Sequence, residues 1–187
     1  MKYLIAGLGN IGLEYSNTRH NIGFKTLEVF ANASNVCFET DRYASRCNIK
    51  FKGKTLILIK PSTYMNLSGK AVNYWLQKEN IPLQNLLVIT DDLALPLGTL
   101  RLKPKGGSGG HNGLTNIEEI LNTQNYSRLR FGIGNDFGYG YQSNYVLGNW
   151  NDDEIKAVNE KIPTVIDIVK SFVSIGVERT MNMYNKK

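Results

Sequence analysis

Leu56-Ile57-Leu58-Ile59 is the stretch that decides the fold class, because four consecutive apolar residues indicate a strand that is buried on both faces. Strands of this kind are typical of parallel sheets that helices cover on both sides. Two further short runs, Lys2 to Leu8 and Leu86 to Ile89, have the same character. Because segments with helical spacing of apolar residues alternate with these runs, the sequence predicts an α/β fold.

Outside these runs, the period of the apolar residues separates helices from strands. One alternating segment places Tyr43, Cys47, Ile49 and Phe51 on the same side of a strand. The expected helices cover 21–33, 67–78 and the region around Ile117, and the further expected strands lie within 43–51, 100–102 and 128–133.

The last quarter of the chain has a helical pattern. Asn151 and Glu154 have the spacing of a capping box, which predicts the start of a helix. Pro163 is expected to open a second helix, since proline is tolerated in a first turn. Gly176 then predicts a break before a last helical segment.

Length and composition favour one compact domain spanning residues 1–187, with 42% hydrophobic and 20% charged residues. No apolar run approaches the roughly 20 residues that cross a bilayer, and the Met1 to Gly7 segment does not resemble a signal peptide. Cys37 and Cys47 match no zinc-binding pattern, so we expect reduced thiols in a cytoplasmic protein. The net charge of +6 favours a polyanionic partner such as nucleic acid.

Polar segments follow the expected strands at the points where they end. The segments 10–20 and 60–66 follow two of the apolar runs, and Asp91 and Asp92 follow a third. In open α/β sheets, ligands bind in the crevice beyond the carboxyl ends of the strands. These segments are therefore expected to converge on one cleft.

The glycines at 7, 9 and 12 fit the G-x-G-x-x-G pattern after a strand, which indicates a dinucleotide site and an oxidoreductase as one alternative. Residues 14–20 intervene before the helical pattern begins, however. Glu39 also lies further along than the usual ribose-binding acid. The other interpretation is a tight turn that requires glycine.

His20 and Asp91 are candidates for acid–base chemistry. A neutral imidazole is the natural base near pH 7, and a carboxylate on one ring nitrogen leaves the other nitrogen as the base. The alternatives are a surface histidine near a helix cap and a solvated aspartate turn.

Three amides, Asn10, Asn66 and Asn112, stand within the polar segments, where each could bind a peptide backbone or stabilise an oxyanion. Asparagine is also common in turns and caps. The glycine-rich stretch 103–113 is flanked by Lys103, which together with Arg130 could bind a phosphate. The alternative is a mobile loop beside a solvated basic face. Neither a Walker motif, a G-x-S-x-G elbow nor a metal triad is present in the sequence.

Taken together, these segments resemble the bacterial peptidyl-tRNA hydrolases. The resemblance is ordered and covers most of the chain. It rests on Gly7-Leu8-Gly9-Asn10 with Tyr15 and Thr18-Arg19-His20-Asn21, on Lys60 to Gly69, on Asp91-Asp92-Leu93 with Pro96 and Gly98, on Gly109-Gly110-His111-Asn112-Gly113, on Arg128 to Gly134 and on Tyr145-Val146-Leu147-Gly148.

The resemblance implies a monomeric enzyme without metal or cofactor, built on a twisted, mostly parallel mixed β-sheet flanked by α-helices, with further helices at the C-terminus. Such an enzyme cleaves the ester between a peptide and the 3′-terminal ribose of tRNA, and it needs no membrane. By the same resemblance, His20 is the general base and Asp91 orients it. Asn10 distinguishes a blocked from a free amino group. Substrate is bound by Asn66 and Asn112, the cleft is lined by Tyr15, Tyr64, Met65 and His111, and a tRNA phosphate is bound by Lys103 and Arg130.

The sequence departs from the family pattern at Ile11, Thr90, Ala94 and Asn135-Asp136. The last of these lacks a positive charge that many members carry, while none replaces His20 or Asp91. A non-catalytic RNA-binding relative is the second alternative, because a fold can persist without its chemistry. Retention of both His20 and Asp91 favours the enzyme.

Overall fold

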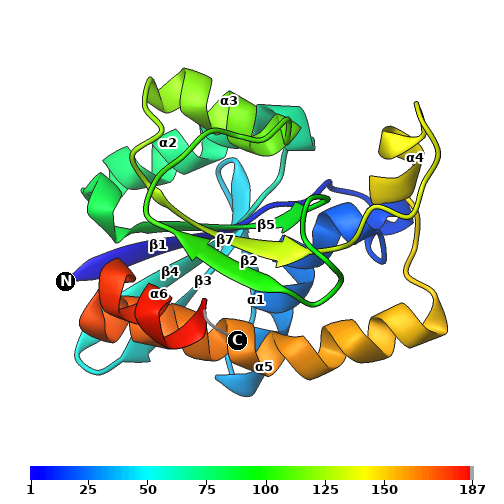
Figure 1. Ribbon diagram of the computed structural model, residues 1–187. Helices are drawn as coiled ribbons and strands as arrows, with labels where there is room; N and C mark the ends of the chain where they lie inside the picture. The colour runs from blue at the N-terminus through cyan, green and yellow to red at the C-terminus, as the bar shows by residue number, and fades with distance from the viewer. Residues whose placement is uncertain (186–187) are drawn as a thin grey trace.

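Seven strands form one mixed sheet in the computed structural model, which describes residues 1–185 (Figure 1). The order across the sheet is β2-β3-β4-β1-β5-β7-β6. The strands are β1 (Lys2–Gly7), β2 (Glu39–Asp41), β3 (Ala44–Phe51), β4 (Lys54–Pro61), β5 (Leu86–Asp92), β6 (Leu100–Lys103) and β7 (Ser127–Gly132).

The four central strands, β4-β1-β5-β7, run parallel, and β2, β3 and β6 are antiparallel to their neighbours. Ile5 of β1, for example, lies between Leu58 of β4 and Leu87 of β5. The expected α/β class, with a mixed sheet that is parallel at its centre, is therefore confirmed.

Helices cover both faces of the sheet (Figure 1). The helices α1 (Ile22–Ala33) and α5 (Asp152–Ile175) pack on one face, and α2 (Ser68–Lys78) and α3 (Asn112–Leu121) pack on the other. A hydrophobic core lies on each face of the sheet. Successive side chains of β1 point to opposite faces, so Leu4 packs in the core beneath α2 and α3 and Ile5 in the core beneath α1 and α5, and both are fully buried. Each such side chain contributes roughly 1.5–3 kcal/mol by its burial.

The backbone of α1 approaches β1 closely, which fixes the position of the segment between them. A Cβ atom at Gly7 would lie 2.4 Å from the carbonyl oxygen of Gly23, and one at Gly23 would lie 2.4 Å from the amide of Leu8. The connecting segment contains two short 3-10 turns, Leu13–Tyr15 and Arg19–Asn21. His20 is therefore held just before the helix and close to the end of β1.

The expected strand around residue 43 begins later than its pattern indicated. Tyr43 has a φ of 62° and lies in the turn between β2 and β3. Its ring lies 5.4 Å from that of Tyr74 on α2. The prediction that Tyr43 shares a strand face with Cys47 is therefore wrong, because a left-handed turn residue does not continue the alternation. Cys47 and Ile49 do belong to the core on the α5 side.

The prediction that Pro163 opens a helix is also wrong, because Pro163 lies inside α5, which is 24 residues long and unbroken. Ile162 and Val165, on either side of the proline, are at most 1% exposed. Their burial offsets the cost of roughly 3 kcal/mol of a proline inside a helix. The capping box of Asn151 and Glu154 is confirmed, and Gly176, with a φ of 84°, separates α5 from α6 (Val177–Tyr184) as expected.

The edge strand β6 is covered by the end of the chain. The side-chain amide of Asn185, just after α6, donates to the carbonyl of Leu102 and accepts from its N–H, at 2.8 and 2.9 Å. A strand edge otherwise presents unpaired backbone groups. One asparagine thus satisfies the outward-facing pair of groups on this residue.

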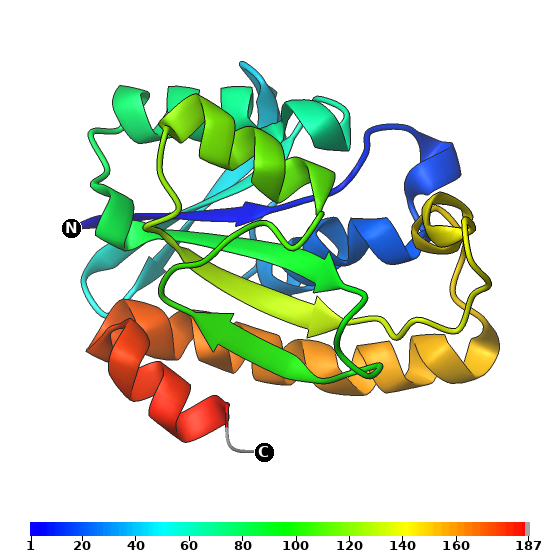
Figure 2. The same cartoon turned by 45° about the horizontal axis from the view of Figure 1, so that its top comes forward.

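The small helix α4 (Gln142–Val146) lies beyond the carboxyl ends of the parallel strands (Figure 2). The segment from β7 through α4 to α5 therefore passes over the edge where the polar segments gather. Within residues 1–185, none of the helices is both long enough and apolar enough to cross a membrane.

Candidate active site

The loops after β1, β4 and β5 and the amino end of α3 meet at the carboxyl ends of the central parallel strands. The parallel strands bring these ends together, as the sequence predicts. His20 lies in the segment after β1, Asp91 lies in β5, and His111 is the residue directly before α3. These three side chains form the centre of the site.

His20 and Asp91 are in direct contact, although 71 positions separate them in the sequence. The Nδ1 atom of His20 lies 2.9 Å from each carboxylate oxygen of Asp91. Both residues are buried, at 8% and 4% exposure. The Nε2 atom of His20 has no hydrogen-bond partner among the described residues, and the ring lines an open cleft. The pairing leaves one ring nitrogen free to take a proton from a bound molecule.

His111 is a second imidazole on the same carboxylate. Its Nδ1 accepts hydrogen bonds from the backbone N–H groups of Gly113 and Leu114, so its ring is the N-cap of α3. An Nδ1 that accepts carries no proton, and the proton of the neutral ring is therefore on Nε2. That Nε2 lies 2.9 Å from Asp91 Oδ1 and 2.7 Å from the hydroxyl of Thr90. The helix cap thus fixes the tautomer that faces Asp91.

The electrostatics of the pair are set by burial and by the two rings. Burial by itself lowers the pKa of His20, but the charge of Asp91 and the hydrogen bond to it outweigh this, so the pKa of His20 is raised above 6.5. Burial by itself raises the pKa of Asp91, yet the facing imidazoles His20 and His111 hold it well below its usual range. Asp91 is therefore a carboxylate at neutral pH.

Asn10 is held in place by two neighbours. Its Oδ1 accepts a hydrogen bond from the backbone N–H of Met65, at 2.7 Å. The side chain of Asn21 accepts from the N–H of Asn10 and donates to its carbonyl, at 2.8 and 2.9 Å. Because Asn10 Oδ1 faces a donor, its Nδ2 is the group left to bind another molecule.

The cleft beside His20 has a volume of about 570 Å³. It is lined by both histidines, by Asn112 at the first turn of α3, by residues of the loop before α4, such as Asn135, and by residues of α4 itself, such as Ser143. The cleft is therefore closed on one side by a helix end and on the other by the segment that follows β7.

The other expected substrate-binding residues lie at different depths. Met65 is buried at 4% exposure, packs in the core beside α2 and contacts Asn10 through its backbone. Tyr64 and Asn66 flank it and are exposed, and Tyr15 is half-buried in the first 3-10 turn. None of these four is among the residues that line the cleft of His20.

A model of the peptidyl-tRNA hydrolase family matches residues 4–187, which is nearly the whole chain. The chain belongs to the peptidyl-tRNA hydrolase family. Among curated relatives, the peptidyl-tRNA hydrolases of Phocaeicola vulgatus and Bacteroides fragilis are 60% and 59% identical to it over 187 residues, and the alignments cover 100% of this chain and of each relative.

The fold is that of solved peptidyl-tRNA hydrolases as well. The crystal structure of peptidyl-tRNA hydrolase from Acinetobacter baumannii at 1.00 Å resolution matches with a TM-score of 0.92 and 35% identity, covering 98% of this chain and 94% of that chain. Sequence and structure agree that this chain is an enzyme that hydrolyses peptidyl-tRNA.

In this peptidyl-tRNA hydrolase, the glycines of the first loop serve packing, and the dinucleotide alternative is wrong. Gly7 lets α1 approach β1, and a Cβ at Gly9 would lie 2.8 Å from the ring of Phe24. The loop leads into two 3-10 turns, whereas a pyrophosphate site needs a helix that starts at the third glycine. Gly12, with a φ of 111°, supplies the turn.

His20, Asp91 and His111 offer ligand atoms within 4.8 Å of one another, a spacing that a metal ion could span. The hydrogen bonds of His111, however, use both of its ring nitrogens, including the Nε2 that faces Asp91. His111 would have to lose its Nε2 proton while its Nδ1 still caps α3, which would leave the ring as an anion. The donor set therefore fits a hydrogen-bonded triad better than a metal centre.

The expected phosphate-binding residues do not form a free pair. Arg130 donates to Asp92 at 3.1 Å and to the carbonyl of Gly107 at 2.7 Å, and its side chain is 13% exposed. Lys103 lies opposite Arg128 in the β6–β7 register, two positions from the residue opposite Arg130. Lys103 and Arg130 thus share a face of the sheet about 7 Å apart along the strand.

Reasoning from sequence missed two features of the site. The contact of His111 with Asp91 was not expected, although the chain has only two histidines and both lie near strand ends or helix starts. The sequence places Asn21 only within a motif and assigns it no role of its own, whereas in the structure it is 3% exposed and holds Asn10. Its signal was a capping-type residue directly before α1.

Proposed function

We propose that His20 is the general base of the hydrolysis and that Asp91 keeps it in the required tautomer. The observation that carries this proposal is the contact between His20 Nδ1 and Asp91, which leaves Nε2 at the wall of the cleft without a partner among residues 1–185. A base must lie within hydrogen-bond reach of the proton that it removes. A water molecule in the cleft beside Nε2 meets this condition.

In the proposed reaction, the water oxygen attacks the ester carbonyl while its proton moves to His20 Nε2. The carbonyl electrons form an oxyanion, and their return breaks the bond to the ribose oxygen. The imidazolium gives its proton to that oxygen. The products are a peptide with a free carboxyl group and a tRNA with a free terminal hydroxyl. The charge of Asp91 stabilises the imidazolium that forms in between.

Asn10 is proposed to select substrates with a blocked amino group. Its Nδ2 is a donor, since its oxygen is already bound to the N–H of Met65. A donor can bind the carbonyl oxygen of an acylated amino group. A free ammonium group has only donors, and it would face Asn10 without a hydrogen bond, which disfavours unblocked aminoacyl-tRNA.

The remaining polar residues are proposed to bind the peptide and the ribose end. Asn112 lies at the start of α3 and lines the cleft, where its amide can donate to the developing oxyanion. Asn66 is exposed near Asn10 and can bind the peptide backbone. Tyr15, Tyr64, Met65 and His111 are proposed to shape the space around the ester.

Lys103 and Arg130 are proposed to bind a tRNA phosphate from one face of the β6–β7 pair. Because Arg130 is already paired with Asp92, a phosphate at this position would share the guanidinium or replace the carboxylate. The net charge of +6 supports a long-range attraction to tRNA. We also propose that residues 1–187 act as a single domain, as a monomer, and in the cytoplasm, where ribosomes produce peptidyl-tRNA.

The test is a comparison of N-acetyl-aminoacyl-tRNA with the same aminoacyl-tRNA left unblocked, in the presence of a chelator. Rapid release of tRNA from the blocked substrate alone is the expected result, because base, selectivity and metal independence all depend on side chains described above. Binding of tRNA without cleavage of either substrate would instead favour the non-catalytic RNA-binding alternative.

A further inference from the structure

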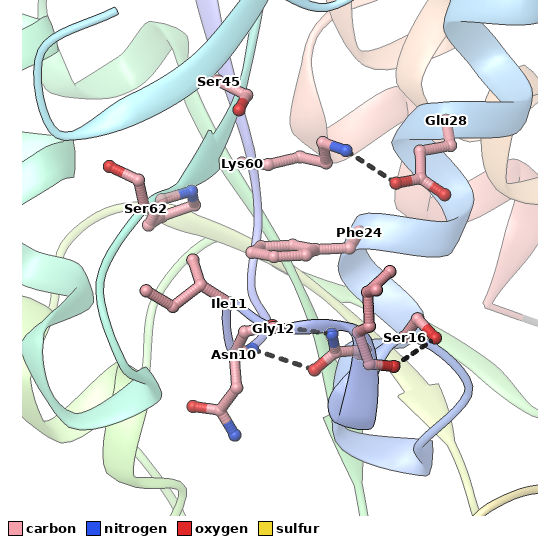
Figure 3. Close-up of a pocket in the computed structure, with 12 residues that line it drawn as sticks. Asn10, Ile11, Gly12, Ser16, Phe24, Glu28, Ser45, Lys60 and Ser62 are labelled. Atoms are coloured by element: carbon pink, nitrogen blue, oxygen red, sulfur yellow. Dashed lines mark hydrogen bonds and ion pairs between the residues drawn. The ribbon is translucent and has the colours of Figure 1, made fainter. Parts of the chain in front are cut away.

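The two residues that flank His20 in the sequence bind different parts of the molecule. Asn21 hydrogen-bonds to the backbone of Asn10, at 2.8 and 2.9 Å, and the dashed lines beside Asn10 in Figure 3 mark these bonds. Arg19 instead contacts α4 and the first turn of α5. His20 therefore lies in one 3-10 turn between two anchors, and the roles proposed above do not involve Arg19.

The guanidinium group of Arg19 joins the two helices. Its Nη2 donates to both carboxylate oxygens of Glu154, at 3.0 and 2.8 Å, and its Nη1 donates to the carbonyl of Tyr145 at 3.2 Å. The Cζ atom lies 4.3 Å from the centre of the Tyr145 ring. The side chains of Arg19 and Glu154 are only 12% and 16% exposed. A planar, delocalised cation can pair and stack in this way at once, whereas an ammonium group cannot.

The backbone of the same segment is also attached to the chain that follows α4, and the two lie side by side in Figure 2. The N–H of Arg19 donates to the carbonyl of Gly148 at 3.0 Å, and Thr18 forms an antiparallel bridge with Asn149. A Cβ atom at Gly148 would lie 2.9 Å from Nη1 of Arg19. Glycine at this position therefore allows the close approach of the two segments.

Helix α4 forms a wall of the cleft of His20, through Gln142, Ser143 and Val146. It has only five residues, which is too short for a helix to be stable by its own hydrogen bonds. Its position therefore depends on contacts with the rest of the molecule. At one side the hydroxyl of Tyr145 donates to the carbonyl of Ile133, at 2.7 Å, and at the other Arg19 holds the carbonyl and the ring of Tyr145.

We propose that Arg19 is a positioning residue of the hydrolysis, which fixes the α4 wall of the cleft relative to His20 and thereby aligns the ester with the base. This deepens the function proposed above and rests on it. A displacement of about 1 Å between reacting groups can lower a rate by about 10²-fold. Glu154 is not among the residues that line the cleft, so it acts through Arg19. The pKa of His20 is set by its burial and by Asp91, so Arg19 affects geometry rather than proton affinity.

The experiment measures kcat for N-acetyl-aminoacyl-tRNA in two variants of the pair. Arg19→Met keeps the length of the side chain and loses the guanidinium, and kcat should fall about ten- to hundredfold. The acidic limb of its pH–kcat profile should stay at the wild-type pH, because Asp91 still faces His20. Binding of tRNA should also stay close to wild type, since the proposed phosphate contacts do not involve Arg19.

Glu154→Gln is the conservative variant, because glutamine can still accept the hydrogen bond from the N–H of Asn151 in the capping box. It removes only the negative charge that faces Arg19. We expect kcat to fall about three- to tenfold, the size expected for weakening one charge-assisted contact. The double variant should lose no more than Arg19→Met alone, since both changes break the same link.

The matched control is Asn151→Ala, which removes the side chain that caps α5 and leaves the pair of Arg19 and Glu154 in place. It should lower the free energy of unfolding in urea while kcat stays at the wild-type value. Circular dichroism at the assay temperature shows whether each variant is folded. This comparison separates a change in the position of α4 from a general loss of stability.

Three results would overturn the proposal. The first is a fall of kcat in Asn151→Ala as large as that in Arg19→Met, and the second is a shifted acidic limb in Arg19→Met. The third is a wild-type kcat in Glu154→Gln, which decides the matter by itself where Arg19→Met does not fold. Failure of the proposed function is distinguishable, because His20→Ala would then cleave the substrate as fast as the wild-type enzyme.

Discussion

At the scale of single residues, one carboxylate joins the two imidazoles of the candidate site. Asp91 faces two imidazoles, and each ring has a different second partner: the first turn of α3 for His111 and the open cleft for His20. The same anion therefore serves a structural ring and a ring that is free to take a proton. Changes at His20 and at Asp91 should consequently have different signatures.

His20→Ala should lower kcat by about 10²–10⁴-fold, the usual contribution of a general base. Binding of tRNA should stay close to wild type, because the proposed phosphate contacts, Lys103 and Arg130, do not involve His20. Single-turnover hydrolysis and a filter-binding measurement on the same preparation separate the two effects. A loss of binding that matched the loss of turnover would show that His20 is structural.

Asp91→Asn should move the acidic limb of the pH–kcat profile to lower pH. The charge of Asp91 and its hydrogen bond raise the pKa of His20 above 6.5, so their removal lets burial lower it. His20 then loses its proton at a lower pH, although the maximal kcat falls because the imidazolium is no longer stabilised. A limb that stays at the wild-type pH would contradict the assignment of Asp91.

The same pair predicts how stability depends on pH. The raised pKa of His20 contributes stability that is present below pH 6.5 and is lost as the pH rises through the folded-state pKa. The lowered pKa of Asp91 contributes stability that is present above pH 3.8 and is lost as the pH falls through its folded-state pKa. Urea unfolding of Asp91→Asn should therefore show its largest deficit between pH 3.8 and 6.5, and an equal deficit at pH 9 would contradict this.

At the scale of elements, the glycine-rich loop before α3 is tied to the sheet. Arg128 and Arg130 both donate to the carbonyl of Gly107, at 3.3 and 2.7 Å. Arg128 is fully buried and also pairs with Glu118 of α3. The sequence left open whether this segment is a mobile loop, and these contacts hold its middle against β7.

Pro163→Ala should stabilise the protein, because α5 runs unbroken through this position. Alanine restores the missing backbone N–H and removes the clash of the ring with the preceding turn, and position 163 is exposed, so the smaller side chain leaves no cavity. We expect a gain of about 1–3 kcal/mol in the free energy of unfolding, measured with urea. A loss of stability would mean that the proline bends α5 to fit the sheet.

Periodicity was sufficient to predict most elements, and it failed where tertiary packing overrides local preference. The apolar runs became the central strands, and the capping box of Asn151 was found because its signal is local. The prediction of a helix start at Pro163 fails because the apolar face of α5 is continuous across this position, and the preference of proline for a first turn takes no account of that packing. The strand prediction fails at Tyr43 because an alternating pattern of apolar residues does not reveal a left-handed turn.

At the scale of the whole molecule, the candidate site was predictable to the extent that it follows from topology. Parallel strands bring their carboxyl ends together, so the meeting of His20 and Asp91 could be expected. The contact of His111 could not, because it depends on the angle at which α3 enters the sheet edge. The pairing of Arg130 with Asp92 depends in the same way on the path of a loop.

Lys103→Ala should weaken tRNA binding and reduce the steepness of its salt dependence. One lost phosphate contact lowers the slope of log K against log salt by about 0.7–0.9. Affinities measured across a salt series test this, with Lys2→Ala, at the amino end of β1, as the control that keeps the wild-type slope. An unchanged slope in Lys103→Ala would exclude the phosphate role.

The amide of Asn185 takes the place of a neighbouring strand for one residue of β6. An enzyme shortened by a few residues at its C-terminus would keep every side chain of the active site and yet expose this backbone pair. Open strand edges promote pairing between molecules. Removal of Asn185 by proteolysis should therefore cause self-association on storage before it causes any loss of turnover.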